Sequence, residues 1–400
     1  MANGEYSFAV YLILIRWCFM SRNICIKDDS VVNKNICNYL SPDYVYIAYD
    51  KKYKLGVKIN DRVLKEDIIL SNGTDFIYST VSGSVSGARK MLVDGEVLPT
   101  IILENDFEEK TKSLKSSARN ISDIDFEVLK NLVYTYTTYR GPLLGETLII
   151  SGIDEDPFEH SYSHIISDYF MELLECIDAL CNILKIHKCF FAIKNNDSDN
   201  VNKLVNSIGT YPSVDLKLMP DVYPIGMKEI FVKELVRNSK LDKGIIFLNV
   251  LDVLTIYHVL KRKKPITEKL ITIGGSALDK TRVVNTKIGT SIKDIIDNCF
   301  KVTCDDYMIV TNGLMKGTEV NSLDMLVTPK LRSVFLIKKE CVSPTKCINC
   351  GLCNIYCPFG CDPKGDYKMD KCNSCGLCSY VCPAKIKLGG KRWEIMFMMI

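Results

Sequence analysis

Residues 347–382 read CINCGLCNIYCPFGCDPKGDYKMDKCNSCGLCSYVC, and this stretch decides how the carboxyl-terminal part of the chain folds. Of the 18 cysteines in the 400-residue chain, ten fall between Cys341 and Cys382. Eight of these form two runs of C-x2-C-x2-C-x3-C, and each run is followed by a proline. This is the spacing with which bacterial proteins bind pairs of iron–sulfur clusters.

The spacing also assigns each cysteine to a cluster. Two-residue gaps let one tight loop supply three thiolates, and the fourth cysteine of each run ligates the other cluster. The cluster 1 thiols are therefore Cys347, Cys350, Cys353 and Cys382. The cluster 2 thiols are Cys372, Cys375, Cys378 and Cys357.

Disulfides and zinc explain the two runs less well. Disulfides belong to exported proteins, and nothing at the amino end of the chain suggests export. Zinc favours paired C-x2-C knuckles, often with histidine, rather than triplets of cysteines. The sequence therefore predicts two [4Fe–4S] clusters. Cys341 and Cys361 lie outside both spacings, so we expect neither to be a ligand.

The composition is that of an ordinary globular protein, with 47% hydrophobic and 25% charged residues. A net charge of +3 shows no bias toward nucleic acid, so no nucleic-acid partner is expected. Residues 8–20, FAVYLILIRWCFM, include Arg16 and are shorter than the roughly 20 apolar residues of a bilayer span. We expect a buried strand or short helix there. The protein should be cytoplasmic, either free or held by partner subunits at the inner face of a membrane.

The rest of the chain predicts a multidomain protein of α/β and α+β modules. After an N-terminal segment, 1–37, short β-rich runs with turns fill residues 38–112. Strands and helices alternate over 121–264, which predicts a parallel sheet with helices on its faces. Cys176, Cys181 and Cys189 fall inside this pattern and are expected to be core thiols rather than ligands. Residues 265–338 predict a small α+β module, 341–388 hold the cysteine runs, and 389–400 form a tail.

Several segments resemble the RnfC family, whose members belong to the Rnf electron transport complex, a ferredoxin:NAD oxidoreductase. They are VKINDRVLKEDIIL (57–70), IISGIDEDPF (149–158), VYPIGMKE (222–229) and KLITIGGSALDKTRVVNTKIGTSIKDII (269–296). The resemblance implies a barrel-sandwich hybrid module over 38–112 and a flavin- and NADH-binding α/β domain over 121–264. It also implies a β-grasp (SLBB-like) module over 265–338 and a bacterial two-cluster ferredoxin domain over 341–388.

The same resemblance implies a cofactor site in the α/β domain. Asp154 and Asp156 occupy the acidic positions of the family, and Gly226 and Lys228 match its Tyr-Pro-x-Gly…Lys loop. The family also has a long Gly-rich loop before the acidic segment, whose backbone amides can approach a flavin phosphate closely. Here YTYTTYRGPLLGET (134–147) is shorter and has only two glycines. The flavin and NADH site is therefore expected to be degenerate, with little FMN or NADH bound.

His160 and His164 lie four residues apart, close to the two aspartates. A metal site is one interpretation of this pattern, and the start of a surface helix is the interpretation that we prefer.

The leading functional hypothesis is an iron–sulfur protein that passes single electrons between a flavoprotein or ferredoxin and a redox partner. It would be a component of an oxidoreductase of the NADH:ferredoxin type rather than a stand-alone enzyme. One alternative is an FMN-containing, NADH-linked member of an Rnf-type ion-translocating complex, because flavin converts hydride chemistry into one-electron steps. A second alternative is a structural adaptor with non-redox clusters. The expected partners are ferredoxin, a flavoprotein or other redox subunits.

Overall fold

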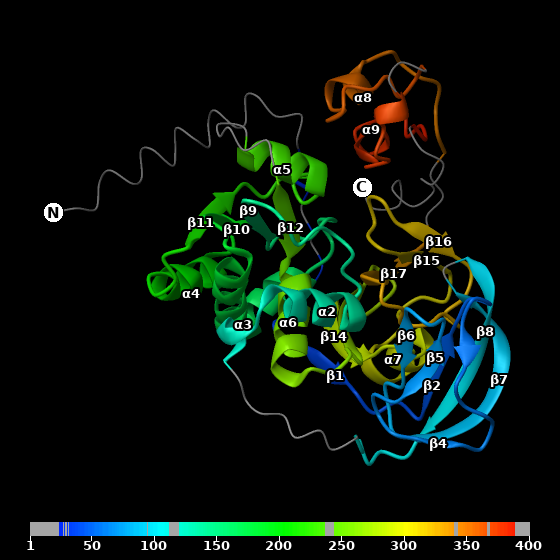
Figure 1. The fold of residues 1–400 in the computed structure, drawn as a ribbon. Coiled ribbons are helices and arrows are strands. Elements are labelled where there is room, and N and C mark those ends of the chain that lie inside the picture. Colours follow the sequence, from blue (N-terminus) through cyan, green and yellow to red (C-terminus); the bar gives the residue numbers. More distant parts are fainter. Residues whose placement is uncertain are drawn as a thin grey trace.

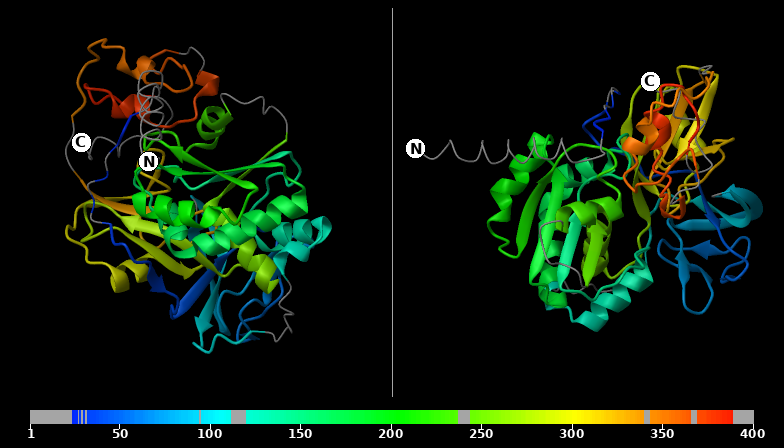
Figure 2. Two further views of the ribbon diagram at one scale, coloured as in Figure 1. Left: turned by 90° about the vertical axis from the view of Figure 1, so that its left-hand side faces the viewer. Right: turned by 90° about the horizontal axis from the view of Figure 1, so that it is seen from above.

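Four β-sheets and the helices around them make up the computed structural model, which describes residues 24–26, 28, 30, 32–93, 95–111, 120–236, 244–339, 343–365 and 369–388. The apolar stretch 8–20, Cys341 and the tail 389–400 lie outside these ranges. Within the described ranges, no helix is long and apolar enough to cross a membrane. Figures 1 and 2 show an α/β body beside a more β-rich body, with the cysteine region at one end.

The α/β body is built on a four-stranded sheet in the order β11-β10-β9-β12. Its strands are all parallel: β9 (Thr147–Ser151), β10 (Lys188–Lys194), β11 (Val214–Met219) and β12 (Ile245–Asn249). Its helices are η1 (Ile121–Asp123), α2 (Phe126–Tyr136), α3 (Ser161–Leu184), α4 (Ser198–Ile208), α5 (Lys228–Val236) and α6 (Val250–Arg262). The predicted parallel sheet with alternating helices is confirmed. The strand order reverses between β9 and β12, and the crevice outside the strand ends at such a point is where α/β sheets bind ligands.

Strand β9 explains how the two faces of this sheet are covered. Successive side chains of a strand point to opposite faces. Leu148 and Ile150 enter a core formed with α3 and α6, whereas Ile149 enters a second core with Phe231 of α5. Both faces are covered, so every residue of β9 is buried. Phe359, from the cysteine region, also packs against the second core.

A six-stranded sheet follows along the chain, in the order β1-β14-β13-β17-β15-β16. It consists of β1 (Cys37–Tyr39), β13 (Glu268–Gly274), β14 (Arg282–Lys287), β15 (Tyr307–Thr311), β16 (Thr318–Val320) and β17 (Ser333–Lys338). Helix α7 (Ile292–Cys299) buries Ile292, Ile295 and Ile296 against it, at helical spacing. The strands and the helix expected over 265–338 are therefore present. Strand β1, which pairs in parallel with β14, was not expected.

Residues 44–105 form two antiparallel sheets with the orders β2-β8-β7-β4 and β3-β5-β6. The strands are β2 (Tyr44–Ala48), β3 (Lys54–Leu55), β4 (Arg62–Val63), β5 (Ile68–Ser71), β6 (Phe76–Tyr78), β7 (Gly83–Val93) and β8 (Glu96–Asn105). At the start of β7, Gly83 has φ +155, and a Cβ there would lie 1.8 Å from the carbonyl oxygen of Glu104. Only glycine lets the long β7–β8 hairpin close at this point.

Residues 24–39, here called the N-terminal strap, run along both bodies rather than forming a separate segment. Ile24 and Tyr223 exchange two backbone hydrogen bonds of 3.0 and 2.7 Å. Asp28 Oδ2 lies 2.6 Å from His160 Nε2 at the start of α3. The strap then ends as β1 in the six-stranded sheet. It therefore connects the α/β body to the β-rich body.

The cysteine region contains three short helices: α8 (Leu352–Ile355), η2 (Met369–Lys371) and α9 (Leu377–Tyr380). It lies near α5 and the strands β15 to β17 (Figure 1). Cys375 and Leu377 share a buried core with Met308 of β15 and Phe335 of β17. The second cysteine run is thus anchored on the six-stranded sheet.

Candidate functional site

The two cysteine runs have the same backbone conformation. In each run a residue with positive φ stands before the second cysteine, another follows that cysteine, and a third lies three residues beyond the fourth cysteine. The pairs are Asn349 (φ 57) and Ser374 (φ 50), Gly351 (φ 74) and Gly376 (φ 79), and Gly360 (φ 69) and Lys385 (φ 53). Each run then places its third cysteine in a one-turn helix, α8 or α9. The sequence repeat is therefore also a structural repeat.

Backbone amides point at the thiols in both runs. The Asn349 amide donates to Cys347 Sγ over 3.4 Å, and the equivalent Ser374 amide donates to Cys372 Sγ over the same 3.4 Å. Hydrogen bonds to sulfur are one of the ways in which a protein sets the reduction potential of an iron–sulfur cluster. The runs therefore contain both the thiols and the donors that such a cluster requires.

The cluster 1 thiols surround a cavity. Its volume is about 270 Å³, and Cys347, Cys350 and Cys353 of the first run line it together with Cys382 of the second. In the described part of the chain, no three metal-binding side chains are close enough to hold one ion. Zinc would need its four ligands within about 2.3 Å of a single centre. Four thiols spread around a cavity suit a multi-iron cluster better, so the donor set fits [4Fe–4S].

The cluster 2 thiols lie close to one another and away from solvent. Burial raises the pKa of the Cys375 thiol to about 12, with further contributions from Cys378, Cys357 and Cys372. Burial, then the thiols of Cys372 and Cys357, likewise raises the pKa of Cys378 to about 11. Metals bind thiolates rather than thiols, so loading this group would release protons. The four thiols again come from both runs, which fits a second cluster.

Exposure separates the two groups. Cys347 and Cys350 are exposed, whereas Cys375, Cys378 and Cys357 are at least nine-tenths buried. The inner group also contacts the α/β body through Tyr223, whose hydroxyl donates a 2.6 Å hydrogen bond to the backbone oxygen of Cys375. Tyr223 belongs to the VYPIGMKE loop. One thiol group thus faces solvent, and the other lies beside the loop of the expected cofactor site.

The other cysteines discussed above do not join these groups. Cys176, Cys181 and Cys189 lie in the core between α3 and the parallel sheet, as predicted. Cys361 is buried next to Cys357, and its amide donates to Cys357 Sγ over 3.2 Å. Cys361 thus contacts the cluster 2 group through its backbone.

Asp156 joins the α/β body to the six-stranded sheet. Its side chain is 2% exposed, and Oδ2 accepts a 2.7 Å hydrogen bond from the amide of Met315, in the loop after β15. Oδ1 accepts from the amide of Phe158 over 3.1 Å. A Cβ at Gly313 would lie 2.4 Å from this carboxylate, so the β15 loop packs tightly against it. Both oxygens of Asp156 are therefore engaged within the protein.

Asp154 is also buried, and Gly226 lies against it. Both carboxylate oxygens of Asp154 lie 3.2 Å from the amide of Tyr162 in α3. Burial, then the charge of Glu159, raises the pKa of Asp154 to about 8. A Cβ at Gly226 would be 2.0 Å from the Asp154 carbonyl oxygen, so only glycine fits there. Lys228 is exposed, with its ammonium 5.4 Å from the ring centre of Phe247.

The loop before β9 is held by its own side chains. The Tyr134 hydroxyl donates to the Gly141 carbonyl and the Tyr139 hydroxyl to the Pro142 carbonyl, each over 2.9 Å. Arg140 Nη1 donates to the Thr137 carbonyl over 2.8 Å. These side chains occupy the loop's own interior, so the loop is a compact turn.

An ionic group at the junction of the two bodies was not anticipated from the sequence. Arg332 Nε lies 3.3 Å from both carboxylate oxygens of Glu159, and Arg332 Nη1 lies 3.4 Å from Glu155. Ser333 Oγ donates to Glu159 over 2.7 Å. The density of acidic residues in IDEDPFEH was the one available signal, and it could not identify the arginine, which is distant in sequence.

His160 and His164 begin α3, as expected, but the expected surface position is wrong for His164. That side chain is 8% exposed, and its Nδ1 and Nε2 each lie 2.9 Å from a backbone oxygen, those of His160 and Asn33. His160 pairs with Asp28 of the N-terminal strap. The strap covers this helix start, which explains the burial.

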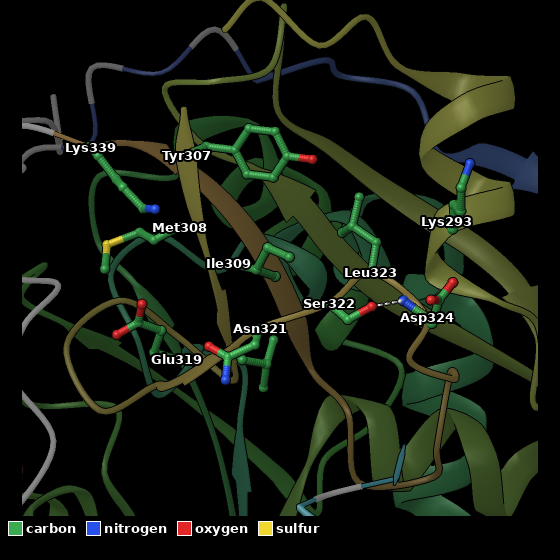
Figure 3. A pocket seen from close by; sticks show the side chains of 11 residues that line it. Lys293, Tyr307, Met308, Ile309, Glu319, Asn321, Ser322, Leu323, Asp324 and Lys339 are labelled. Atoms are coloured by element: carbon green, nitrogen blue, oxygen red, sulfur yellow. Dashed lines mark hydrogen bonds between the residues drawn. The ribbon is translucent and has the colours of Figure 1, made fainter. Parts of the chain in front are cut away.

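A separate hollow of about 380 Å³ lies on the six-stranded sheet beside β15 and β16 (Figure 3). Lys293 and Lys339 stand on opposite sides of it, and Tyr307 lies at its rim (Figure 3). It contains none of the residues predicted as site residues.

Comparisons with known proteins place these features. A sequence profile described as "Nuo51 FMN-binding domain" matches residues 133–259. The chain is 23% identical over 360 residues to the C-type subunit of the ion-translocating oxidoreductase complex of Buchnera aphidicola, and the match covers 82% of this chain and 75% of that relative. It is 20% identical over 312 residues to the C-type subunit of the Na(+)-translocating ferredoxin:NAD(+) oxidoreductase complex of Acetobacterium woodii, with coverages of 72% and 70%. An NAD+-reducing [NiFe]-hydrogenase structure aligns with a TM-score of 0.43 and 11% identity, over 52% of this chain and 42% of that one.

The fold and the thiol groups define a protein of the electron-transfer oxidoreductase class. Within that class, the chain is a relative of the RnfC proteins, the C-type subunits of ion-translocating oxidoreductase complexes. The resemblance expected from the sequence is thereby confirmed.

Proposed function

We propose that this chain is an electron-transfer subunit of an Rnf-type oxidoreductase complex. It passes single electrons through two [4Fe–4S] clusters between a flavoprotein or ferredoxin and a redox partner. The observation that carries the proposal is the pairing of the two cysteine runs, in which three thiols of one run share a cavity with the last thiol of the other. The Rnf-type relatives support the same function.

The chain's residues have distinct roles in this proposal. Cys347, Cys350, Cys353 and Cys382 hold cluster 1, and Cys372, Cys375, Cys378 and Cys357 hold cluster 2. The clusters, when bound, supply one-electron redox chemistry. Amide donors such as those of Asn349 and Ser374 stabilise the thiolate charge. Burial of the cluster 2 thiols keeps water from that group.

The exposure of the two groups suggests a route. The inner cluster 2 thiols contact the VYPIGMKE loop of the α/β body through Tyr223. The cluster 1 thiols lie on the solvent side. Electrons would cross between the α/β body and an external partner through cluster 2 and then cluster 1, or in reverse.

An FMN-containing, NADH-linked protein of such a complex is the second candidate, and the profile match over residues 133–259 favours it. The compact loop before β9 and the buried, internally bonded Asp154 and Asp156 favour a domain that keeps the fold and binds little FMN or NADH. In that case Asp154, Asp156 and Gly226 serve the junction between the two bodies. Of the four expected site residues, Lys228 alone stays exposed to meet a ligand.

Module identities and location complete the proposal. Residues 38–112 are assigned to a barrel-sandwich hybrid module and 121–264 to the flavin-binding type of α/β domain. Residues 265–338 are assigned to an SLBB-like β-grasp module and 341–388 to a two-cluster ferredoxin domain. The protein would be cytoplasmic and held at the inner face of a membrane by the other subunits, since its relatives are named as subunits of ion-translocating complexes.

Anaerobic purification tests the proposal, with iron, acid-labile sulfide, zinc and flavin counted per chain. Two [4Fe–4S] clusters require about eight irons and eight sulfides. After reduction, magnetic resonance should show two interacting paramagnets. Stoichiometric zinc without sulfide would exclude the electron-transfer function, and clusters that resist every reductant would favour a structural adaptor. Stoichiometric FMN reduced by NADH would favour the second candidate.

A further inference from the structure

The surface around the cluster 1 thiols combines exposed thiols with an exposed apolar side chain. Cys347 and Cys350 are exposed, and Ile348 between them is 65% exposed while also lining the cavity. A large apolar side chain at the mouth of a functional cavity is suited to contact with another molecule. An apolar centre with a polar rim is the usual anatomy of a protein interface.

The charges at this surface are mostly positive. The described parts of the cysteine region, 343–365 and 369–388, contain five lysines and two aspartates, with no arginine or glutamate. Lys364 lines the cavity itself, and its ammonium bonds to Asn349 Oδ1 over 2.7 Å. Lys346 and Lys387 are exposed and adjoin cavity-lining residues in the chain.

Asp362, the aspartate closest in sequence to the cavity-lining lysine, is engaged in a local turn. Its Oδ1 accepts a 3.1 Å hydrogen bond from the backbone amide of Lys364. The ammonium of Lys364 bonds instead to the neutral side chain of Asn349. The Lys364 charge therefore stays at the cavity rim.

We infer that this surface, here called the lysine face and made of Ile348, Lys346, Lys364 and Lys387, docks an acidic one-electron carrier protein. The inference rests on the proposed function, because it takes the cluster 1 thiols to hold a cluster. Ile348 supplies the apolar centre and the lysines supply a charge complementary to carboxylates. Charge steering raises the rate of encounter, while a small interface allows rapid release, as transient electron-transfer complexes require.

An anionic membrane surface would also attract lysines, but the geometry favours a redox protein. The lysines adjoin a cavity lined by four thiols, and a lipid surface placed there would block the exposed cluster without exchanging electrons. The apolar contribution is a single isoleucine, which is small for membrane insertion.

The test uses the anaerobic holoprotein, with its iron content verified first. The probe is a small acidic [4Fe–4S] ferredoxin, and binding is measured by titration at several ionic strengths, separately from electron exchange by stopped flow. The variant Lys346→Gln/Lys364→Gln/Lys387→Gln removes the charges. Its matched control is Lys51→Gln/Lys58→Gln, which changes exposed lysines on the β-rich body.

Wild type and control should bind the acidic ferredoxin in a salt-sensitive manner. The triple variant should lose about tenfold in association rate at low salt, with unchanged iron content. A basic cytochrome c should show the opposite response to salt and to the substitutions. Equal binding by the triple variant and wild type would overturn the inference, as would stronger binding to vesicles of anionic lipid than to the ferredoxin. Absence of iron in the wild type would instead reject the proposed function.

Discussion

At the scale of single residues, the same chemical group has three environments in this chain. Some thiols are exposed beside lysines, others are buried beside Tyr223, and a third set is packed in the core of the α/β body. Thiol reactivity and metal binding depend on these environments rather than on the residue type. Substitutions of cysteine should therefore have very different consequences at different positions.

The first prediction separates ligands from bystanders. Cys350→Ser or Cys375→Ser should remove one cluster and about half of the iron, because serine is a poor ligand for iron–sulfur clusters. Cys361→Ser should keep the full iron content, since its contact with Cys357 is made by the backbone amide. Iron and sulfide analysis of the anaerobic proteins measures this. Loss of iron in Cys361→Ser, with Cys350→Ser unaffected, would contradict the assignment.

The second prediction concerns the buried carboxyl of Asp154. Burial raises its pKa from 3.8 to about 8, so the folded protein holds this proton more tightly than the unfolded chain. Stability from this group is present at low pH and is lost as pH rises toward the folded pKa. Between about pH 5 and pH 8, wild type should lose up to roughly 1.4 kcal/mol per pH unit relative to Asp154→Asn.

The measurement is the difference in thermal midpoint between wild type and Asp154→Asn across that pH range, under anaerobic conditions. Effects of pH on the clusters are common to both proteins and cancel in the difference. Asp215→Asn, on the exposed side of β11, is a control that should show no such trend. A difference between wild type and Asp154→Asn that stays constant with pH would mean that Asp154 is ionised in the folded protein.

At the scale of elements, two loops and one extended segment decide how the bodies meet. The acidic loop after β9 bonds to the six-stranded sheet through Asp156 and Glu159. The VYPIGMKE loop after β11 bonds to the cysteine region through Tyr223. The N-terminal strap pairs with that same loop and with β14. Segments expected to bind a cofactor thus also form the contacts between bodies.

The third prediction belongs to the loop before β9. A phosphate site at this place needs converging backbone amides, and here the loop folds on its own side chains. Losing two or three charge-assisted hydrogen bonds, roughly 1.5–3 kcal/mol each, would weaken FMN binding about a thousandfold or more. The purified protein should therefore contain little FMN and oxidise NADH slowly, if at all.

Flavin fluorescence after denaturation measures the content, and titration of the holoprotein with FMN measures the affinity. Lys228→Ala is the informative variant, because Lys228 is the exposed residue of the expected site. Stoichiometric FMN that NADH bleaches, and that Lys228→Ala abolishes, would contradict this prediction and favour the flavin-containing alternative.

At the scale of the whole molecule, the cysteine region lies with one thiol group toward solvent and one toward the protein (Figure 1). Only the inner group contributes to a core shared with the six-stranded sheet, through Cys375 and Leu377. The two clusters should consequently differ in accessibility, although their binding sequences are nearly identical.

The fourth prediction is that air or a chelator removes the clusters in two phases. About half of the iron should be lost quickly from cluster 1, whose thiols Cys347 and Cys350 are exposed, and the rest slowly. Timed iron release with magnetic resonance of the remaining cluster measures this. Cys375→Ser, which keeps only cluster 1, should lose its iron in the fast phase alone. A single rate for all iron would show that the two sites are equally accessible.

Local patterns in the sequence were sufficient for much of this molecule. The repeated spacing of Cys347 to Cys357 and Cys372 to Cys382 predicted the grouping of thiols, because loop geometry depends on neighbouring residues. Apolar periodicity predicted the parallel strands and α3, because each element must bury one or both faces. The shortened loop before β9 was also visible as missing glycines.

The tertiary structure alone decided which thiol group is buried, where the N-terminal strap lies and what Asp154 and Asp156 contact. Each of these depends on residues far apart in the chain, such as Tyr223 with Cys375, Asp28 with His160, and Asp156 with Met315. The reason is physical: a carboxylate or a tyrosine has no sequence signature for its partner. Its partner is determined when the bodies pack and every buried polar group must find a hydrogen bond.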